Sequence, residues 1–280
     1  MFLATPLALA LLLAPQAARG SSELEAGFHT LYNLQFDAAQ KQFQEYQRRN
    51  PADPLGFAAE AAGLAFQEFH RLGLLTSRNF LGDRPQADGS APKPDEVLSR
   101  RFHAAMDRAQ NLAQQRLLTN PGDQNALFAM ALTGGLHADY TYLVERQGWA
   151  SLKLVRDAES TARRLLEINP DYYDAYLALG ALNYILANLP IHQRLFLRVA
   201  GISGDKRRAF TLMESVAQRG GLLAPFARIL LALMCLREQE TARARRLLLE
   251  LQEQFPLNSI FPTELALLDH GAARAGGHRP

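Results

Sequence analysis

A sixteen-residue segment that ends in proline occurs four times in this chain, and no other feature constrains the fold as strongly. The copies are FDAAQKQFQEYQRRNP (36–51), MDRAQNLAQQRLLTNP (106–121), VRDAESTARRLLEINP (155–170) and TARARRLLLELQEQFP (241–256). The fourth position is always alanine, at Ala39, Ala109, Ala158 and Ala244, and the eighth is small or apolar, at Phe43, Ala113, Ala162 and Leu248. Small residues on one helical face let another helix approach closely, and the proline prevents the helix from continuing. Each copy therefore predicts a helix that packs closely against a neighbour.

A second helical pattern follows three of the four prolines. After Pro170, the segment DYYDAYLALGAL places Tyr176, Leu179 and Gly180 on one helical face. The equivalent positions are Phe57, Glu60 and Ala61 after Pro51, and Leu127, Met130 and Ala131 after Pro121. Each unit thus predicts a helical hairpin, with helices starting near residues 22, 36, 54, 95, 123, 149, 171, 205, 222, 240 and 260. Because no segment shows the period-2 pattern typical of strands, we expect an all-α fold of about eleven helices.

These hairpins resemble the tetratricopeptide repeats (TPR), whose 34-residue pattern has an aromatic residue, Leu-Gly, Ala, a large apolar residue and a closing Pro. The match is best at Tyr176, Leu179 and Gly180 and in the four segments that run from alanine to proline. The closing prolines, at positions 51, 121, 170 and 256, stand 70, 49 and 86 residues apart, so the repeats are degenerate. The resemblance implies a right-handed superhelix, an α-solenoid of TPR-like helical hairpins.

A narrower likeness concerns residues 176–256. Leu189-Pro190, an apolar stretch, GISGD (201–205) and an amphipathic helix are together similar to the core of the inclusion-body-clearance family of TPR proteins. This likeness implies a non-enzymatic scaffold that associates with membranes or lipid bodies.

The segment GISGDKRRAF (201–210) also raises the alternative of a phosphate site. Its glycines are too close together for the P-loop pattern G-x-x-x-x-G-K-[ST], and Asp205 displaces the lysine. It lacks the second glycine of a G-x-S-x-G nucleophile elbow as well. We expect a helix-starting turn with Ser203 or Asp205 as the N-cap, and an anionic-ligand site stays open as the alternative.

Composition argues against several classes of function. With 30 basic and 28 acidic residues the formal net charge is +2, so the chain lacks the charge excess typical of nucleic-acid-binding proteins. Cys235 is the single cysteine, and the seven histidines form neither H-E-x-x-H nor a spaced Cys/His set. We therefore expect no metal, no cofactor and no nucleic-acid partner. Because no nucleophile, base and orienting group can be paired from the sequence, we also expect no enzyme activity.

The N-terminus predicts export. The apolar run LALALLLA (7–14) is too short to span a bilayer and precedes a small-residue site at Ala18-Arg19-Gly20. We expect a signal peptide at 1–20, a TPR-like helical repeat domain at 21–270 and a flexible tail at 271–280. The protein would then be exported, and periplasmic or envelope-associated. No Lys or Arg precedes the apolar run, so a retained anchor and a misplaced start codon are the alternatives.

In the TPR arrangement, the first helix of each hairpin lines a concave groove. The resemblance implies a partner-binding groove at Asn125, Phe128, Leu132, Leu136, Asp174, Leu177, Ala181 and Tyr184. Such a surface is mostly apolar with a few polar groups, and it would hold a helical or extended apolar peptide of another protein. The alternative is that the helices close over the groove and leave these residues as core.

Basic pairs recur on the second helices of the hairpins. They are Arg48-Arg49, Arg100-Arg101, Arg163-Arg164, Arg207-Arg208 and Arg245-Arg246. A solvated outer face is the simpler interpretation, and contact with anionic lipid headgroups or an acidic partner would require the pairs to converge in space. We expect a non-catalytic scaffold for protein interaction or assembly, with a lipid- or membrane-surface-associated protein as the alternative.

Overall fold

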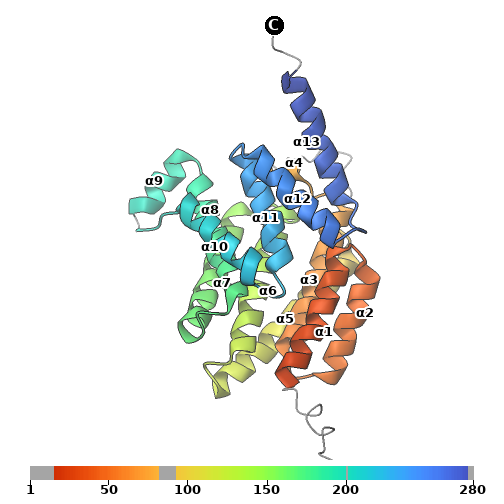
Figure 1. The fold of residues 1–280 in the computed structure, drawn as a ribbon. Coiled ribbons are helices and arrows are strands. Elements are labelled where there is room, and N and C mark those ends of the chain that lie inside the picture. Colours follow the sequence, from red (N-terminus) through yellow and green to blue (C-terminus); the bar gives the residue numbers. More distant parts are fainter. Residues whose placement is uncertain (1–15, 82–92, 200, 277–280) are drawn as a thin grey trace, which may run out of the picture.

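The computed structural model describes residues 16–81, 93–199 and 201–276 (Figure 1). These ranges contain thirteen α-helices, a short 3₁₀ helix and no strand, which confirms the all-α prediction. The helices are α1 (Gln16–Tyr32), α2 (Phe36–Arg49), α3 (Pro54–Arg71), α4 (Ser77–Leu81), α5 (Glu96–Thr119), α6 (Gln124–Leu143), α7 (Gly148–Ile168), η2 (Tyr173–Ala175), α8 (Tyr176–Asn188), α9 (Ile191–Val199), α10 (Lys206–Arg219), α11 (Ala224–Arg237), α12 (Thr241–Gln254) and α13 (Ile260–Gly276).

Parts of the expected domain organisation lie outside the described residues. The apolar run of the expected signal peptide (7–14) is outside them, whereas residues 16–20 belong to α1. At the other end α13 continues to Gly276, and residues 277–280 of the expected tail are again outside. No helix within the described ranges is long and apolar enough to cross a membrane.

The expected count of about eleven helices is too low, because the sequence patterns do not predict α4 and α9. α4 has only five residues, fewer than two helical turns, so it carries no readable periodicity. α9 begins directly after Pro190, where the sequence predicts only the end of the preceding helix. The other eleven helices correspond to the predicted ones.

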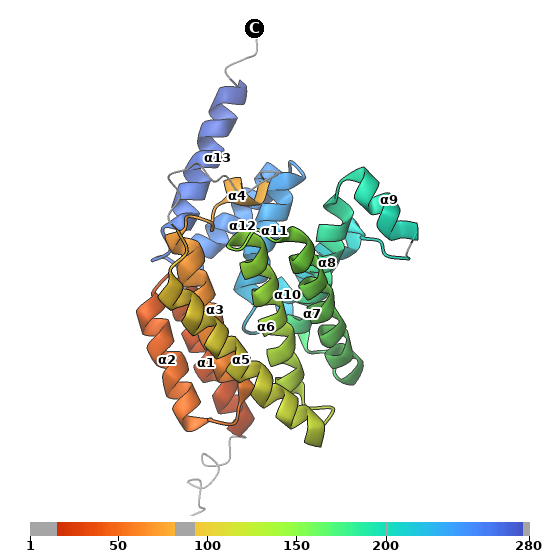
Figure 2. The ribbon, with the colours of Figure 1, turned by 180° about the vertical axis from the view of Figure 1, so that it is seen from behind.

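Apart from the short helices α4 and α9, successive helices form five hairpins, α1–α2, α3–α5, α6–α7, α8–α10 and α11–α12, and α13 packs against α12 (Figures 1 and 2). The four proline-ended segments lie in the second helix of four of these hairpins. The remaining second helix, α10, carries a further copy that a search for proline misses. This copy, KRRAFTLMESVAQRGG (206–221), has buried Ala209 and Met213 at its fourth and eighth positions and Gly221 in place of proline.

Small residues bring the two helices of a hairpin together. A Cβ atom on Gly180 in α8 would lie 3.2 Å from the Met213 side chain and 3.4 Å from the Ala209 carbonyl oxygen in α10. In the preceding hairpin, a Cβ atom on Gly134 would lie 3.1 Å from the Cβ atom of Ala158. The alanine at the fourth position therefore faces the first helix of its own hairpin, as its helix-packing role requires.

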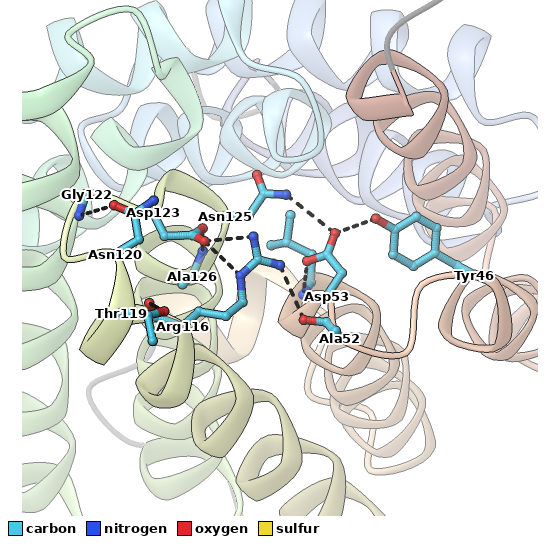
Figure 3. Close-up of polar contacts among 11 residues, drawn as sticks. Tyr46, Ala52, Asp53, Arg116, Thr119, Asn120, Gly122, Asp123, Asn125 and Ala126 are labelled. Carbon is cyan, nitrogen blue, oxygen red and sulfur yellow. Dashed lines mark hydrogen bonds and ion pairs between the residues drawn. The ribbon is translucent and has the colours of Figure 1, made fainter.

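A polar network joins the turns that follow two of the repeated segments (Figure 3). Asp53 and Asp123 cap α3 and α6, and each accepts a hydrogen bond from a backbone N–H of the first turn, at 3.1 and 3.0 Å. The eleventh residue of the preceding segment donates to the same carboxylate. Tyr46 Oη donates to Asp53 Oδ2 at 2.6 Å. Arg116 Nε donates to Asp123 Oδ2 at 2.8 Å. Each of these two repeated helices thereby fixes the start of the next hairpin.

The segment GISGDKRRAF turns the chain from α9 into α10. Asp205 is the N-cap of α10, and its side chain accepts a hydrogen bond from the Arg208 N–H at 3.1 Å, which confirms the capping prediction for this residue. Gly201 has a φ of +75°, a backbone conformation that favours glycine. A Cβ atom on Gly204 would lie 2.3 Å from the backbone nitrogen of Ala187. Both glycines are therefore needed for the close return of the chain onto α8.

Turns near the end of the chain contact the first helix. Tyr32 Oη in α1 donates to the Leu222 carbonyl oxygen at 3.0 Å, and Asn258 Nδ2 donates to the Tyr32 carbonyl oxygen at 2.8 Å. The backbone N–H of Ser77, at the start of α4, donates to Glu264 Oε1 in α13 at 3.1 Å. The first helices of all five hairpins consequently face one common interior.

Candidate functional site

A cavity of about 190 Å³ lies in this common interior. The first helices of the five hairpins, α1, α3, α6, α8 and α11, all contribute to its lining, and α4 adds Phe80. The aromatic lining residues are Phe28, Tyr32, Phe66, Phe80, Phe128, Tyr184 and Phe226. Alanine and leucine side chains of α6, α8 and α11 supply much of the remaining wall, so the cavity suits an apolar group.

All of the predicted groove residues except Asn125 line this cavity. Asn125 lies instead in the turn network, where its Nδ2 donates to Asp53 Oδ2 at 3.4 Å (Figure 3). The buried members of the set are Phe128, Leu136, Asp174 and Tyr184, and those that keep partial exposure are Leu132, Leu177 and Ala181. The first helices thus bring these residues together around one cavity, and the lining residues Asp139 and Ile185 keep exposed surface.

Asp174 has a structural role at the edge of this cavity. Its carboxylate accepts hydrogen bonds from the backbone N–H groups of Gly221, Leu222 and Leu223 at 2.9, 3.0 and 3.2 Å. Burial raises the pKa of Asp174 to about 6, although these three hydrogen bonds act in the opposite direction. The side chain thus fixes the turn before α11, and its acceptor oxygens are already used.

Asp139 is the functional candidate that the sequence patterns miss. It follows Phe128, Leu132 and Gly135 along one face of α6, and all four line the cavity. Asp139 keeps exposed surface, and the protein around its carboxyl group disfavours the charged form and raises the pKa to about 7. Within the described part of the chain it has no hydrogen-bond or ion-pair partner. The one sequence signal is an acid placed at helical spacing on an apolar face.

The remaining reactive side chains do not converge on this cavity. Asp139 and His137 point in different directions, as their spacing on a helix predicts, and the His137 ring makes an edge contact with His103 at 6.3 Å between centroids. Cys235 is buried outside the cavity lining, and its desolvation raises the pKa of the thiol to about 11. Among the described residues, no group of three or more His, Cys, Asp or Glu side chains is arranged to hold a metal ion. The arrangement supports binding by shape and by one carboxyl group.

The basic pairs are spread over five helices, and many of their charges are locally offset. Arg48 and Arg49 both pair with Glu45 in α2. In α7, Arg163 pairs with Glu159, and in α12 Arg245 pairs with Asp269 of α13 at 3.3 Å. These contacts agree with a solvated outer face laced with ion pairs.

Comparison with protein-family models finds no match for this chain, and comparison with curated proteins finds none.

Proposed function

We propose that this chain is a non-catalytic binding protein, a superhelix of degenerate TPR-like hairpins, that takes an apolar segment of a partner protein into its central cavity. The cavity itself carries the proposal. Protein interiors are close-packed and an unfilled cavity costs stability, so a cavity of this size supports a role in binding. An engineered cavity of about 150 Å³ in another protein binds benzene, so a volume of about 190 Å³ suffices for an apolar side chain.

The character of the lining favours a binding role over catalysis. Aromatic and aliphatic side chains dominate it, and among the described residues Asp139 and Asp174 are its charged members. Of these, Asp174 is committed to the turn before α11. A nucleophile with a base within reach is what an enzyme would require, and the lining offers no such pair. Export to the periplasm or envelope belongs to this proposal and rests on the signal-peptide pattern at 1–20.

The variant Gly135→Phe provides the test. A Cβ atom on Gly135 would meet nothing within 4 Å, so a phenylalanine there extends into the cavity without a backbone clash. Replacing a glycine inside a helix also favours folding, so the variant is expected to keep its thermal stability. Ala104→Phe is the matched control, because Ala104 is exposed on α5 and lies outside the cavity lining.

The measurement is affinity capture by residues 21–280 from the envelope fraction of the native organism, with quantification of bound proteins and lipids. A stoichiometric protein that wild type and Ala104→Phe retain, and that Gly135→Phe loses, supports the proposal. Equal capture by both phenylalanine variants contradicts a role for the cavity.

Association with a membrane surface is a second candidate, favoured by α9. This helix exposes Ile191, Leu195, Phe196 and Val199. No acidic residue occurs between Asp174 and Asp205, whereas α9 carries two arginines, a combination suited to an anionic interface. Co-sedimentation with vesicles that contain an anionic phospholipid should weaken on Phe196→Ser and persist on Leu118→Ser, which alters an equally exposed apolar residue of α5. Equal sedimentation of both variants would remove the support from α9.

A further inference from the structure

The carboxyl group of Asp139 has no counterpart in the cavity that could satisfy it. In the part of the chain that the structure describes, no Lys, Arg or His side chain belongs to the lining. The other lining carboxylate, Asp174, already accepts three backbone hydrogen bonds. The largely apolar lining around Asp139 stabilises a charged carboxylate less than water does, which agrees with its raised pKa. A bound group that brings positive charge and hydrogen-bond donors would remove this penalty.

We propose that Asp139 binds the ammonium group of a ligand whose aliphatic body fills the cavity, as the side chain of a lysine in the partner protein would. The inference rests on the proposed function, since it requires the cavity to hold an apolar body. An ammonium group supplies three N–H donors and a charge to the carboxylate, and such charge-assisted bonds are stronger than neutral ones. A hydroxyl group would donate a single hydrogen bond and bring no positive charge, and a ligand carboxylate would be repelled.

The α6 helix sets the orientation of this ligand. Phe128, Leu132 and Gly135 form an apolar stripe that ends at Asp139, and the four positions span about 16 Å along the helix axis. The aliphatic body therefore lies toward Phe128 and the ammonium group toward Asp139. A cavity of about 190 Å³ is somewhat larger than one that holds benzene, which sets the body at about six carbon atoms.

Three six-carbon probes test this assignment, namely hexylamine, 1-hexanol and hexanoate. They are titrated into residues 21–280 at pH 8, where the amine is protonated and Asp139 is mostly ionised. Dissociation constants come from shifts of the Gly135 backbone amide in ¹H–¹⁵N NMR spectra. Hexylammonium should bind about tenfold more tightly than hexanol, and hexanoate should bind most weakly. Asp139→Asn should remove the preference for the amine and leave the hexanol affinity unchanged, whereas Asp139→Glu should retain the preference.

The outcomes separate this inference from the proposed function. Equal affinities of hexylammonium and hexanol for the wild type, or an unchanged preference in Asp139→Asn, would overturn the role of Asp139 and leave an apolar binding cavity. If none of the probes shifts the Gly135 amide, the cavity does not hold an apolar body, and the proposed function fails together with the inference.

Discussion

The two helices α4 and α9 occupy equivalent places in the chain and have opposite roles in the structure. Each is inserted between the two helices of a hairpin, α4 between α3 and α5 and α9 between α8 and α10. α4 turns inward, where Phe80 lines the cavity and stacks on Tyr184 with ring centroids 6.4 Å apart. α9 stands away from the body in both views (Figures 1 and 2), and its Phe196 is 74% exposed. The hairpins thus provide the scaffold. Of the two inserted helices, α4 adds an aromatic side chain to the cavity lining, and α9 exposes one to solvent.

The polar contacts of the two insertions differ in the same way. The segment around α4 is held from the body by side chains: Glu264 accepts from the Ser77 N–H, and buried Glu68 accepts from the Asp95 N–H at 2.8 Å. The segment around α9 is held by Arg194 Nη1, which donates to the Ala187 carbonyl oxygen of α8 at 3.3 Å, and by close packing of its return at Gly204. Different substitutions should therefore release the two insertions.

The largest effect is expected from Gly204→Val. The added Cβ atom would lie 2.3 Å from the Ala187 nitrogen and 2.4 Å from the Asn183 carbonyl oxygen, and backbone atoms cannot move aside cheaply. We expect a loss of about 3 kcal/mol in the free energy of unfolding, measured by urea denaturation. Gly201→Ala is the control for a strained backbone without a clash and should cost about 1–2 kcal/mol. Equal losses in the two variants would show that the return onto α8 does not depend on close packing.

The next effect is expected from Glu68→Ala, which releases the far end of the α4 segment. Glu68 accepts from Arg71 Nε at 2.8 Å as well as from the Asp95 N–H, and its side chain is 1% exposed. Breaking a buried pair costs about 3–5 kcal/mol. Because Arg71 is 35% exposed and can be solvated, we expect about 2–3 kcal/mol in urea denaturation. Hydrogen exchange should accelerate at Asp95 and in α4 but not in α9. Acceleration in both insertions alike would contradict separate anchoring.

A direct comparison of the two insertions uses one substitution in each, Phe80→Ala and Phe196→Ala. Removal of a fully buried phenylalanine costs about 3–5 kcal/mol of stability. Phe80 is partly buried, so we expect Phe80→Ala to lower the free energy of unfolding by about 2 kcal/mol. Phe196 is mostly exposed, and its removal should change stability by less than about 0.5 kcal/mol. Thermal denaturation of both variants measures the difference. A substantial loss in Phe196→Ala would mean that α9 packs against the body in solution.

The sequence predicts the helical scaffold well, because its signals are local. Alanine at the fourth position and proline at the sixteenth define four second helices, and the N-cap at Asp205 defines the start of a further one. The prediction misses the fifth copy of the repeated segment because Gly221 replaces the proline that ends the others. It misses α4 and α9 because one is too short for periodicity and the other follows Pro190 directly.

The site is predictable only in part. Helical spacing places Phe128, Leu132 and Leu136 on one face, and they do line one cavity. The way the five first helices come together around one cavity depends on contacts between residues far apart in sequence, such as Tyr32 with Leu222, which no local pattern encodes. The position of Asp139 on this face of α6 follows from the same helical spacing. Its raised pKa depends on the surrounding helices, which the spacing does not predict.

The smallest effect concerns the pH dependence of stability, which tests whether α4 helps to exclude water from Asp139. The native pKa of Asp139, about 7, lies above the value of about 3.9 for an unfolded chain. The native state therefore binds more protons than the unfolded state between these values, and stability should fall as the pH rises toward 7. Asp174, with a pKa of about 6, contributes in the same direction below that pH, so the interval from 6 to 8 reports mainly on Asp139.

Urea denaturation at pH 6, 7 and 8 measures this fall, and Asp139→Asn should remove it. Phe80→Ala should reduce the fall, because loss of this lining side chain increases the hydration of the cavity that Asp139 also lines and lowers the pKa of its carboxyl group. Phe196→Ala should leave the fall unchanged, because α9 does not contribute to the cavity lining. An identical pH dependence in the Phe80 and Phe196 variants would mean that α4 does not shield Asp139, and the contrast between an inward and an outward insertion would then be limited to packing.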